Sequence, residues 1–252
     1  MIAAILDEEG EGPPVIYVPG MDASGELLLE TAKSIRGRFR LVRLHYLSEA
    51  EEARPEDPYK HLASSIADVT KHLGPALIVA ESFGGAVALQ LALDYPQRFV
   101  GLMIVNSFAH YSPRFKIALS RLLTPIVPGS VFAHGRRFFA PKTLFGDRQE
   151  KEAIAAFQVI EGVRFDKGYR RRLRMIQKLD LRPRLSEIQQ PIALYAGDKD
   201  LVVESQSEMA EMATALPNAT FEIVEGGGHI ILPLDAEPWV ERLEAVAARA
   251  GI

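Results

Sequence analysis

Short apolar segments alternate with longer amphipathic segments along most of this chain, and this alternation limits the possible folds more than any other feature. Six segments have the length and apolar character of buried strands: 15–18, 39–44, 76–80, 99–105, 192–196 and 221–224. Helical patterns lie between them at 27–35, 59–73, 85–95, 204–216 and 238–248. Strict alternation of this kind predicts the α/β class, with a mostly parallel sheet covered on both faces. Ligands of such sheets bind beyond the carboxyl ends of the strands.

The alternation stops between residues 107 and 188, where no strand pattern is present. Five prolines interrupt this segment, and it holds ten of the twenty aromatic residues of the chain. We therefore expect two parts: an α/β body formed by residues 1–106 and 189–252, and a helical cap formed by residues 107–188. One face of the cap should be apolar, because aromatic residues at helical spacing usually pack inward.

Charge divides the chain in the same way. The net charge is −4, which argues against a general nucleic-acid binder. The segment 107–188 nevertheless has 17 lysines and arginines against 7 acidic residues, whereas the rest has 12 against 26. This asymmetry fits either an acidic carrier protein or an anionic membrane surface as a partner. A solvated basic face without a partner fits equally well.

Composition excludes several classes of protein. Cysteine is absent, which rules out disulfides, thiolate zinc sites and cysteine nucleophiles. No apolar run approaches the roughly 20 residues of a membrane helix, and the opening MIAAILDEEGEG becomes acidic too early for a signal peptide. We expect a soluble, cytoplasmic protein that needs no cofactor and no metal.

The sharpest motif is the sequence Ala-Glu-Ser-Phe-Gly-Gly at residues 80–85, between a predicted strand and a predicted helix. A serine at such a turn has strained backbone geometry, and the residues two before and two after it must be small. Ala80 and Gly84 meet this requirement, although glycine is usual at both positions. The alternative is a serine that simply caps a glycine-rich helix. The motif resembles the nucleophile elbow of α/β-hydrolases, with Ser82 as the nucleophile.

The resemblance implies a serine, an acid and a histidine in that order along the chain. A serine needs a neighbouring base, and the base needs an acid that fixes its tautomer. His229 follows three glycines after a predicted strand, and Asp198 and Asp200 follow another. The family pattern G-D-x-D favours Asp200 as the acid, which leaves Asp198 as a structural turn residue. The other five histidines are interpreted as structural, although His45 follows a predicted strand.

The same resemblance implies an oxyanion hole made of two backbone N–H groups. Phe83, directly after the serine, supplies one donor, and Met21 in the turn 18–25 supplies the other. Gly20 allows that turn to be tight. We expect Asp22 or Ser24 to cap the helix that follows.

Two families share further features with the chain. The pairing of residues 19–25 with residues 81–85 resembles the hydrolase portion of plant phytyl ester synthases and related bacterial proteins, which act on fatty acyl esters. Chain length and cap position are similar to those of pimeloyl carrier-protein methyl ester esterases, which bind an acidic carrier through basic cap residues. The resemblance implies an esterase or lipase that acts on a small, hydrophobic acyl ester. An acyltransferase or thioesterase with the same triad, and a ligand-binding protein without catalysis, are the alternatives.

Overall fold

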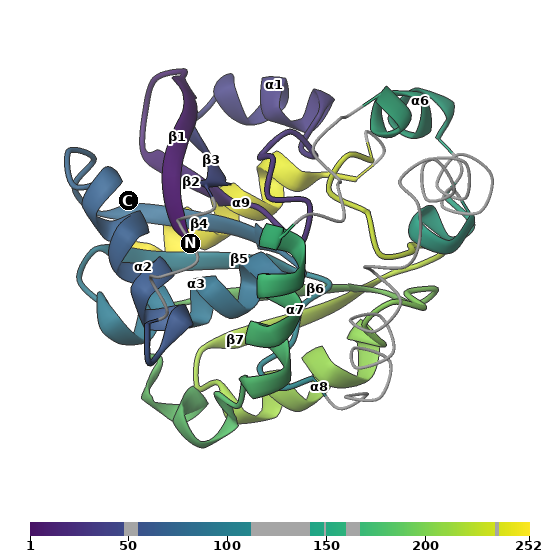
Figure 1. Cartoon of the computed structure of the whole chain (residues 1–252). Helices are drawn as coiled ribbons and strands as arrows, with labels where there is room; N and C mark the ends of the chain where they lie inside the picture. The colour runs from purple at the N-terminus through teal and green to yellow at the C-terminus, as the bar shows by residue number, and fades with distance from the viewer. Residues whose placement is uncertain (48–54, 112–141, 149, 160–166, 235–236) are drawn as a thin grey trace.

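A seven-stranded sheet, built from the described residues, forms the centre of the molecule (Figure 1). This computed structural model describes residues 1–47, 55–111, 142–148, 150–159, 167–234 and 237–252. The strands are β1 (Ile2–Glu9), β2 (Pro14–Val18), β3 (Arg40–Leu47), β4 (Ala76–Glu81), β5 (Phe99–Val105), β6 (Ile192–Gly197) and β7 (Ala219–Val224). Their order in the sheet is β1-β3-β2-β4-β5-β6-β7. All neighbouring pairs are parallel except β1 and β3. The predicted fold class is confirmed.

Strand β1 was not predicted, and it differs from the other strands. It runs antiparallel to β3, from the pair Ile2 and Leu47 to the pair Glu9 and Leu41. Only Ala3 of its eight residues is buried, and the others are partly or fully exposed, as is usual for a strand at the edge of a sheet. Strand β7 at the opposite edge is also half exposed, so the expectation that all strands are buried is wrong for this strand. Central strand β4 is buried along its whole length, as parallel strands with helices on both faces are.

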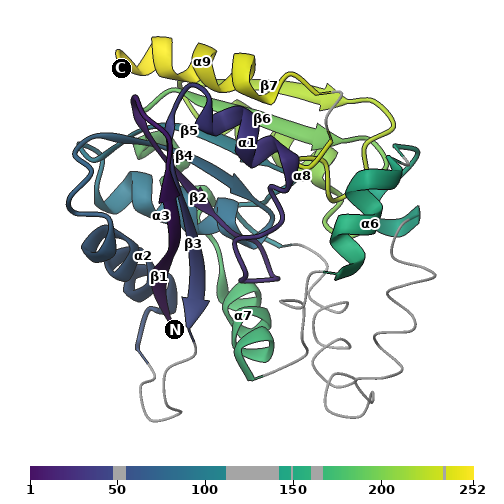
Figure 2. The same ribbon diagram turned by 90° about the horizontal axis from the view of Figure 1, so that it is seen from above.

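Helices cover both faces of the sheet. They are α1 (Glu30–Arg36), α2 (Pro58–Val69), α3 (Phe83–Asp94), α8 (Ser205–Ala215) and α9 (Trp239–Ala250). The helices α2, α3 and α8 share one apolar core with the sheet, and α1 and α9 share the other. Figure 2 shows α1 and α9 together on one side. Helix α3 is buried on all sides over most of its length, which explains its continuously apolar sequence.

The start of α2 shows how local sequence sets the boundary of a helix. Asp57 accepts hydrogen bonds from the N–H groups of Tyr59 and Lys60 at 3.0 and 3.1 Å. Pro58 occupies the first helical position, where its missing N–H has no consequence.

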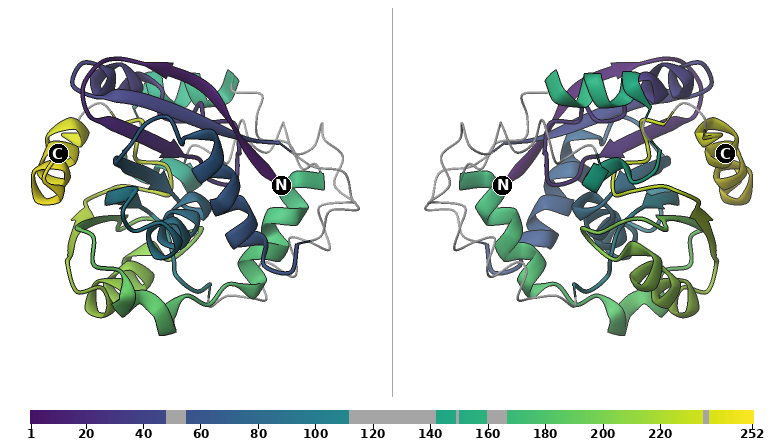
Figure 3. Two further views of the ribbon diagram at one scale, coloured as in Figure 1. Left: turned by 90° about the vertical axis from the view of Figure 1, so that its left-hand side faces the viewer. Right: turned by 90° about the vertical axis from the view of Figure 1, so that its right-hand side faces the viewer.

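The C-terminal helix α9 lies on the side of the molecule away from the N-terminus (Figure 3).

The described residues between β5 and β6 include α6 (Lys151–Val159), α7 (Lys167–Lys178) and the 3₁₀ helix η1 (Arg182–Glu187). Helix α6 lies beyond the ends to which the arrowheads of β6 and β7 point (Figure 2). Its Phe157 packs edge-on against Phe145 with ring centroids 5.7 Å apart. Much of the predicted cap, including Phe115, Phe132, Phe138, Phe139 and Phe165, lies outside the described residues. The division at residues 107 and 188 therefore stays a prediction.

Across the described residues, no helix combines the length and the apolar character that crossing a membrane requires.

Candidate active site

Ser82 lies at the sharp turn between β4 and α3. Its backbone has φ 52° and ψ −125°, a left-handed φ that L-residues rarely adopt, and its side chain is 8% exposed. A Cβ on Gly84 would lie 2.2 Å from the carbonyl oxygen of Val18, so only glycine lets α3 pass this close to the end of β2. Ser107 donates its hydroxyl to the carbonyl of Ser82 at 2.7 Å. The turn at Ser82 is thus in contact with the chain at the ends of both strands that neighbour β4, which are β2 and β5.

The imidazole of His229 connects Ser82 to a buried carboxylate. Its Nε2 lies 2.9 Å from the Ser82 hydroxyl oxygen, and its Nδ1 lies 2.8 Å from an oxygen of Asp200. Since the Asp200 carboxylate only accepts, Nδ1 carries the proton and Nε2 is free to accept from the Ser82 hydroxyl. The structure therefore brings together the three predicted side chains in one hydrogen-bonded series.

The two aspartates of the loop after β6 have different positions. Asp200 is 7% exposed, and its second oxygen accepts from the N–H groups of Val202 and Val203. Asp198 does not contact the imidazole in this way; it accepts from the N–H of Gly226 at 2.7 Å and pairs with Lys199. Asp198 thus fixes the start of the histidine loop, and Asp200 faces the histidine.

Burial and the ion pair act in opposite directions on the pKa of His229. Burial lowers the pKa of the imidazole, but the Asp200 carboxylate outweighs it, so the pKa lies above the ordinary value of 6.5. For Asp200, burial raises the pKa, whereas the charge and hydrogen bond of His229 outweigh it and lower the pKa below 3.8. An ionised carboxylate next to an imidazole that protonates readily is suited to general-base work.

The histidine loop is held mainly by main-chain contacts. Ile230 donates its N–H to the carbonyl of Leu144 at 2.7 Å, and Gly226 accepts from the N–H of Asp147 at 2.8 Å. A Cβ on Gly228 would lie 2.4 Å from Leu144 O. The glycines before His229 therefore serve close main-chain packing as well as the turn itself.

Asn106 is a buried residue of the site that the sequence interpretation missed. Its amide nitrogen donates to the carbonyls of Gly228 and His229, both at 2.9 Å. Its oxygen accepts from the N–H of Gly197 and from the hydroxyl of Ser205, both at 2.8 Å. The residue is fully buried and has φ 46°. A polar residue directly after a strand that ends at the site was the only signal for it.

The predicted oxyanion turn lies against the nucleophile. A Cβ on Gly20 would lie 3.4 Å from the Cβ of Ser82. Phe83 is the first residue of α3, and N–H groups in the first turn of a helix have no partner within the helix. The sequence interpretation of Asp22 and Ser24 as helix caps is wrong, because α1 begins only at residue 30. Asp22 instead accepts from the N–H and hydroxyl of Ser24 and stabilises the turn itself.

A second buried carboxylate, which the sequence interpretation also missed, directly precedes the nucleophile. Glu81 is 3% exposed and accepts a hydrogen bond from the hydroxyl of Tyr17. Burial, together with the nearby carboxylate of Asp22, raises the pKa of Glu81 to about 7, although the Tyr17 hydrogen bond acts against the rise. The charge beneath the nucleophile therefore changes near neutral pH.

The remaining histidines in the described residues lie elsewhere. His45 is inside β3, opposite Ala4, rather than after a strand end. His72 lies 2.9 Å from a carboxylate oxygen of Glu8, and His134 lies outside the described residues. Within the described ranges, no group of three or more His, Cys, Asp or Glu residues is arranged to bind a metal ion.

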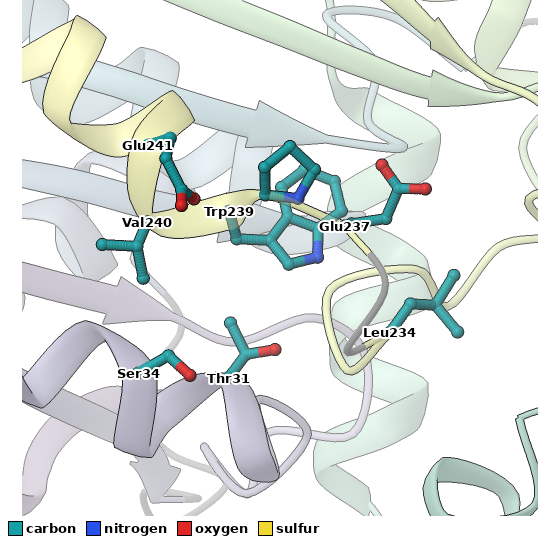
Figure 4. Close-up of a pocket in the computed structure, with 8 residues that line it drawn as sticks. Thr31, Ser34, Leu234, Glu237, Trp239, Val240 and Glu241 are labelled. Atoms are coloured by element: carbon teal, nitrogen blue, oxygen red, sulfur yellow. The ribbon is translucent and has the colours of Figure 1, made fainter.

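A cavity of about 370 Å³ lies between α1 and the start of α9 (Figure 4). It is lined by polar and apolar side chains that include Thr31, Ser34, Glu237 and Trp239. The indole nitrogen of Trp239 is buried and has no hydrogen-bond partner there. No member of the series Ser82, His229 and Asp200 lines this cavity.

Comparisons with known proteins identify the superfamily of the chain. The family model described as "Serine aminopeptidase, S33" matches residues 56–237, which is more than half of the chain. The "Putative carbamate hydrolase RutD" of Caulobacter vibrioides is 25% identical over 244 residues, covering 91% of this chain and 88% of that protein. The predicted superfamily is confirmed, and the two narrower resemblances stay predictions.

Solved structures share the fold. An enol-lactonase from Burkholderia xenovorans LB400 has a TM-score of 0.81 at 17% identity, covering 98% of this chain and 96% of that chain. The esterase EaEST from Exiguobacterium antarcticum has a TM-score of 0.80 at 17% identity, with 98% and 95% covered. At these identities the likeness shows the fold alone.

Proposed function

Because this chain belongs to the serine aminopeptidase S33 family of α/β-hydrolases, we propose that it hydrolyses carboxylic esters through Ser82, His229 and Asp200. The observation that carries the proposal is the continuous series of two hydrogen bonds, 2.9 Å from Ser82 to His229 and 2.8 Å from His229 to Asp200. A hydroxyl within reach of an oriented base is the arrangement that activates a serine.

The reaction follows from this geometry. His229 Nε2 takes the hydroxyl proton as Ser82 Oγ attacks the ester carbonyl carbon, and Asp200 stabilises the imidazolium that forms. The N–H groups of Met21 and Phe83 stabilise the negative oxygen of the tetrahedral intermediate. The imidazolium then protonates the leaving alcohol, which leaves an acyl group on Ser82. Water then attacks the carbonyl carbon of this acyl-enzyme while His229 takes its proton, the bond from that carbon to Ser82 Oγ breaks, and the imidazolium returns the proton to Ser82 Oγ as the carboxylic acid leaves.

We expect a hydrophobic acyl group in the substrate. The part of the predicted cap that the structure describes supports this, because Phe108, Tyr111, Phe145 and Phe157 are all buried there. Tyr111 also donates its hydroxyl to the carbonyl of Val202 in the acid loop at 2.9 Å. This segment is thus hydrogen-bonded to the acid loop, and its aromatic side chains favour a substrate with an apolar acyl chain.

A panel of p-nitrophenyl esters from acetate to palmitate tests the proposal. Wild type should turn over at least one chain length, and Ser82→Ala should lose about 10³-fold or more of kcat. A fluorophosphonate should label wild type but not Ser82→Ala. If a folded wild type neither hydrolyses an ester nor takes the label, the proposal is wrong, and a ligand-binding role is favoured.

Two further substrates separate the alternatives. An aminoacyl p-nitroanilide tests the peptidase activity that the family description names, and we expect it to be a much poorer substrate than the best ester. Product analysis with an added alcohol distinguishes hydrolysis from acyl transfer, because a transferase would form a new ester at the expense of free acid.

A further inference from the structure

Arg172 on helix α7 is buried, although it belongs to a run of basic residues whose sequence predicts a solvated face. Its side chain is 4% exposed, whereas Arg174 and Lys178 on the same helix are exposed. Burial of a guanidinium is costly unless hydrogen bonds replace its water. The position of Arg172 therefore indicates a specific partner.

That partner is the carbonyl of Met21. Arg172 donates to this oxygen through Nε at 3.2 Å and through Nη2 at 2.9 Å. Its Nη1 lies 3.8 Å from the sulfur of Met1, and its guanidinium lies 5.9 Å from the centroid of the Tyr169 ring. Two charge-assisted bonds converge on one oxygen of the turn that faces Ser82.

A second side chain holds the same turn from the other end. The hydroxyl of Tyr46 on β3 donates to the carbonyl of Pro19 at 2.9 Å. The carbonyls of Pro19 and Met21 belong to the peptide groups on either side of the Gly20–Met21 peptide. The N–H of Met21 lies in this central peptide group. Its orientation is thus restrained by one residue of the sheet and one residue of α7.

We propose that Arg172 is a positioning residue that fixes the orientation of the Met21 N–H toward the developing oxyanion. This inference rests on the proposed function, in which that N–H stabilises the tetrahedral intermediate. A donor stabilises a transition state only where it is held in place beforehand. Loss of the two bonds should therefore lower kcat, and KM should change little because the ground-state ester does not depend on this donor.

The same contacts remove Arg172 from the set of cations that an acidic partner would use. Its donors face a carbonyl inside the molecule, whereas the exposed cations of α7 face solvent. A substitution of the whole arginine run would therefore combine loss of surface charge with disruption of the oxyanion turn, and the two effects must be tested separately.

The test compares Arg172→Met and Arg172→Lys with the matched control Arg174→Met on the same helix. Each is measured on a p-nitrophenyl ester and on its thiono analogue, in which sulfur replaces the carbonyl oxygen and accepts hydrogen bonds poorly. We expect Arg172→Met to lose about 10- to 100-fold of kcat on the oxygen ester, with KM within about twofold. The thiono ester should lose far less. Arg172→Lys should recover part of the loss, and Arg174→Met should stay within about twofold of wild type.

Hydrogen exchange provides a readout that does not depend on turnover. In Arg172→Met, amides of residues 21–24 should exchange faster, while amides of the central strands keep their wild-type protection. If Arg172→Met does not fold, Arg172→Lys provides the test. Its ratio of kcat on the oxygen ester to kcat on the thiono ester should be lower than the wild-type ratio.

An unchanged kcat, or equal losses on both esters, would overturn the positioning role. Unaltered exchange at residues 21–24 would overturn it as well. Full activity of Ser82→Ala would instead overturn the proposed function, and exchange alone would then decide whether Arg172 holds the turn.

Discussion

The two halves of the candidate site are held in different ways. Main-chain hydrogen bonds and close glycine packing fix the histidine loop, with Asn106 as an additional link. The oxyanion turn has main-chain bonds at Ala23, but the peptide groups on either side of the Met21 N–H are held by the side chains of Tyr46 and Arg172. Main-chain contacts depend on the shape of the backbone, whereas side-chain contacts can be removed one at a time. The position of the histidine loop should therefore be sensitive to backbone disruption, and the position of the Met21 N–H to the loss of a single supporting side chain.

The largest effect is expected at the carboxylates of the proton-transfer half. Asp200→Asn should lower kcat by about 10³- to 10⁴-fold, because the amide can no longer fix the Nδ1–H tautomer of His229 or stabilise its cation. Asp198→Asn is the matched control on the same loop, and its loss should be less than about tenfold. Steady-state kinetics on one p-nitrophenyl ester measures both. Equal losses would contradict the assignment of the acid to Asp200 rather than Asp198.

A substitution at Gly228 tests whether the backbone holds the histidine. In Gly228→Ala the added methyl group would meet Leu144 O at 2.4 Å, so the loop must shift. We expect kcat to fall about 100-fold and the free energy of unfolding to fall by about 1–3 kcal/mol. Gly37→Ala, at an ordinary negative φ, is the control and should leave kcat unchanged. A fully active Gly228→Ala would contradict the main-chain account.

The ionisation of Glu81, which directly precedes the nucleophile, should make the free energy of unfolding depend on pH. Its pKa is about 7 in the folded protein and close to 4.5 when unfolded, so its contribution to stability is complete below pH 4.5 and is lost as pH rises to about 7. Denaturant unfolding measures this effect at pH 5 and at pH 8. Between these two pH values the free energy of unfolding of wild type should fall by about 2–3 kcal/mol more than that of Glu81→Gln. Parallel stability curves for the two proteins would rule out the raised pKa.

The pH profile of the enzyme gives a related expectation. The neutral imidazole is the active form, so kcat/KM should rise with pH through the pKa of His229, which lies above 6.5. Because the Glu81 carboxylate also raises the pKa of His229, Glu81→Gln should shift this limb to lower pH.

The smallest effect is expected at the exposed cations of α7. Arg174→Gln with Lys178→Gln should leave turnover of a soluble ester within about twofold, since neither residue contacts the site. If the basic segment binds an acidic carrier, the same variant should lose a few-fold in kcat/KM on a carrier-bound ester, and the loss should shrink as salt is added. If the variant and wild type have equal kcat/KM on both substrates at low salt, the basic residues of α7 form a solvated face without a partner.

The nucleophile and its partners could be predicted from the sequence because each leaves a local mark. The residue two positions after Ser82 must be glycine, because α3 passes close to the end of β2 at Gly84. Asp200 and His229 lie directly after strands whose apolar runs are easy to recognise. Short-range steric rules thus locate Ser82, whereas Asp200 and His229 were assigned from the order of residues that the resemblance to α/β-hydrolases implies.

Other residues could not be predicted because their roles arise from contacts between distant parts of the chain. Arg172 lies within a run of arginines, and only packing against Met21, about 150 residues away, distinguishes it. Glu81 occupies a position that the elbow motif does not specify, and only the structure shows that Tyr17 and Asp22 lie near its carboxylate. Strand β1 lacks a clear alternation, and its position depends on its pairing with β3 and on its contact with α2.

The single tryptophan of the chain, Trp239, is buried at the start of α9, with the guanidinium of Arg242 4.7 Å from its ring centroid and Tyr195 edge-on at 5.5 Å. Its emission therefore reports the docking of the C-terminal helix rather than events at the nucleophile. Fluorescence can follow the unfolding of every variant above in samples without ester, so that a loss of structure can be distinguished from a loss of turnover.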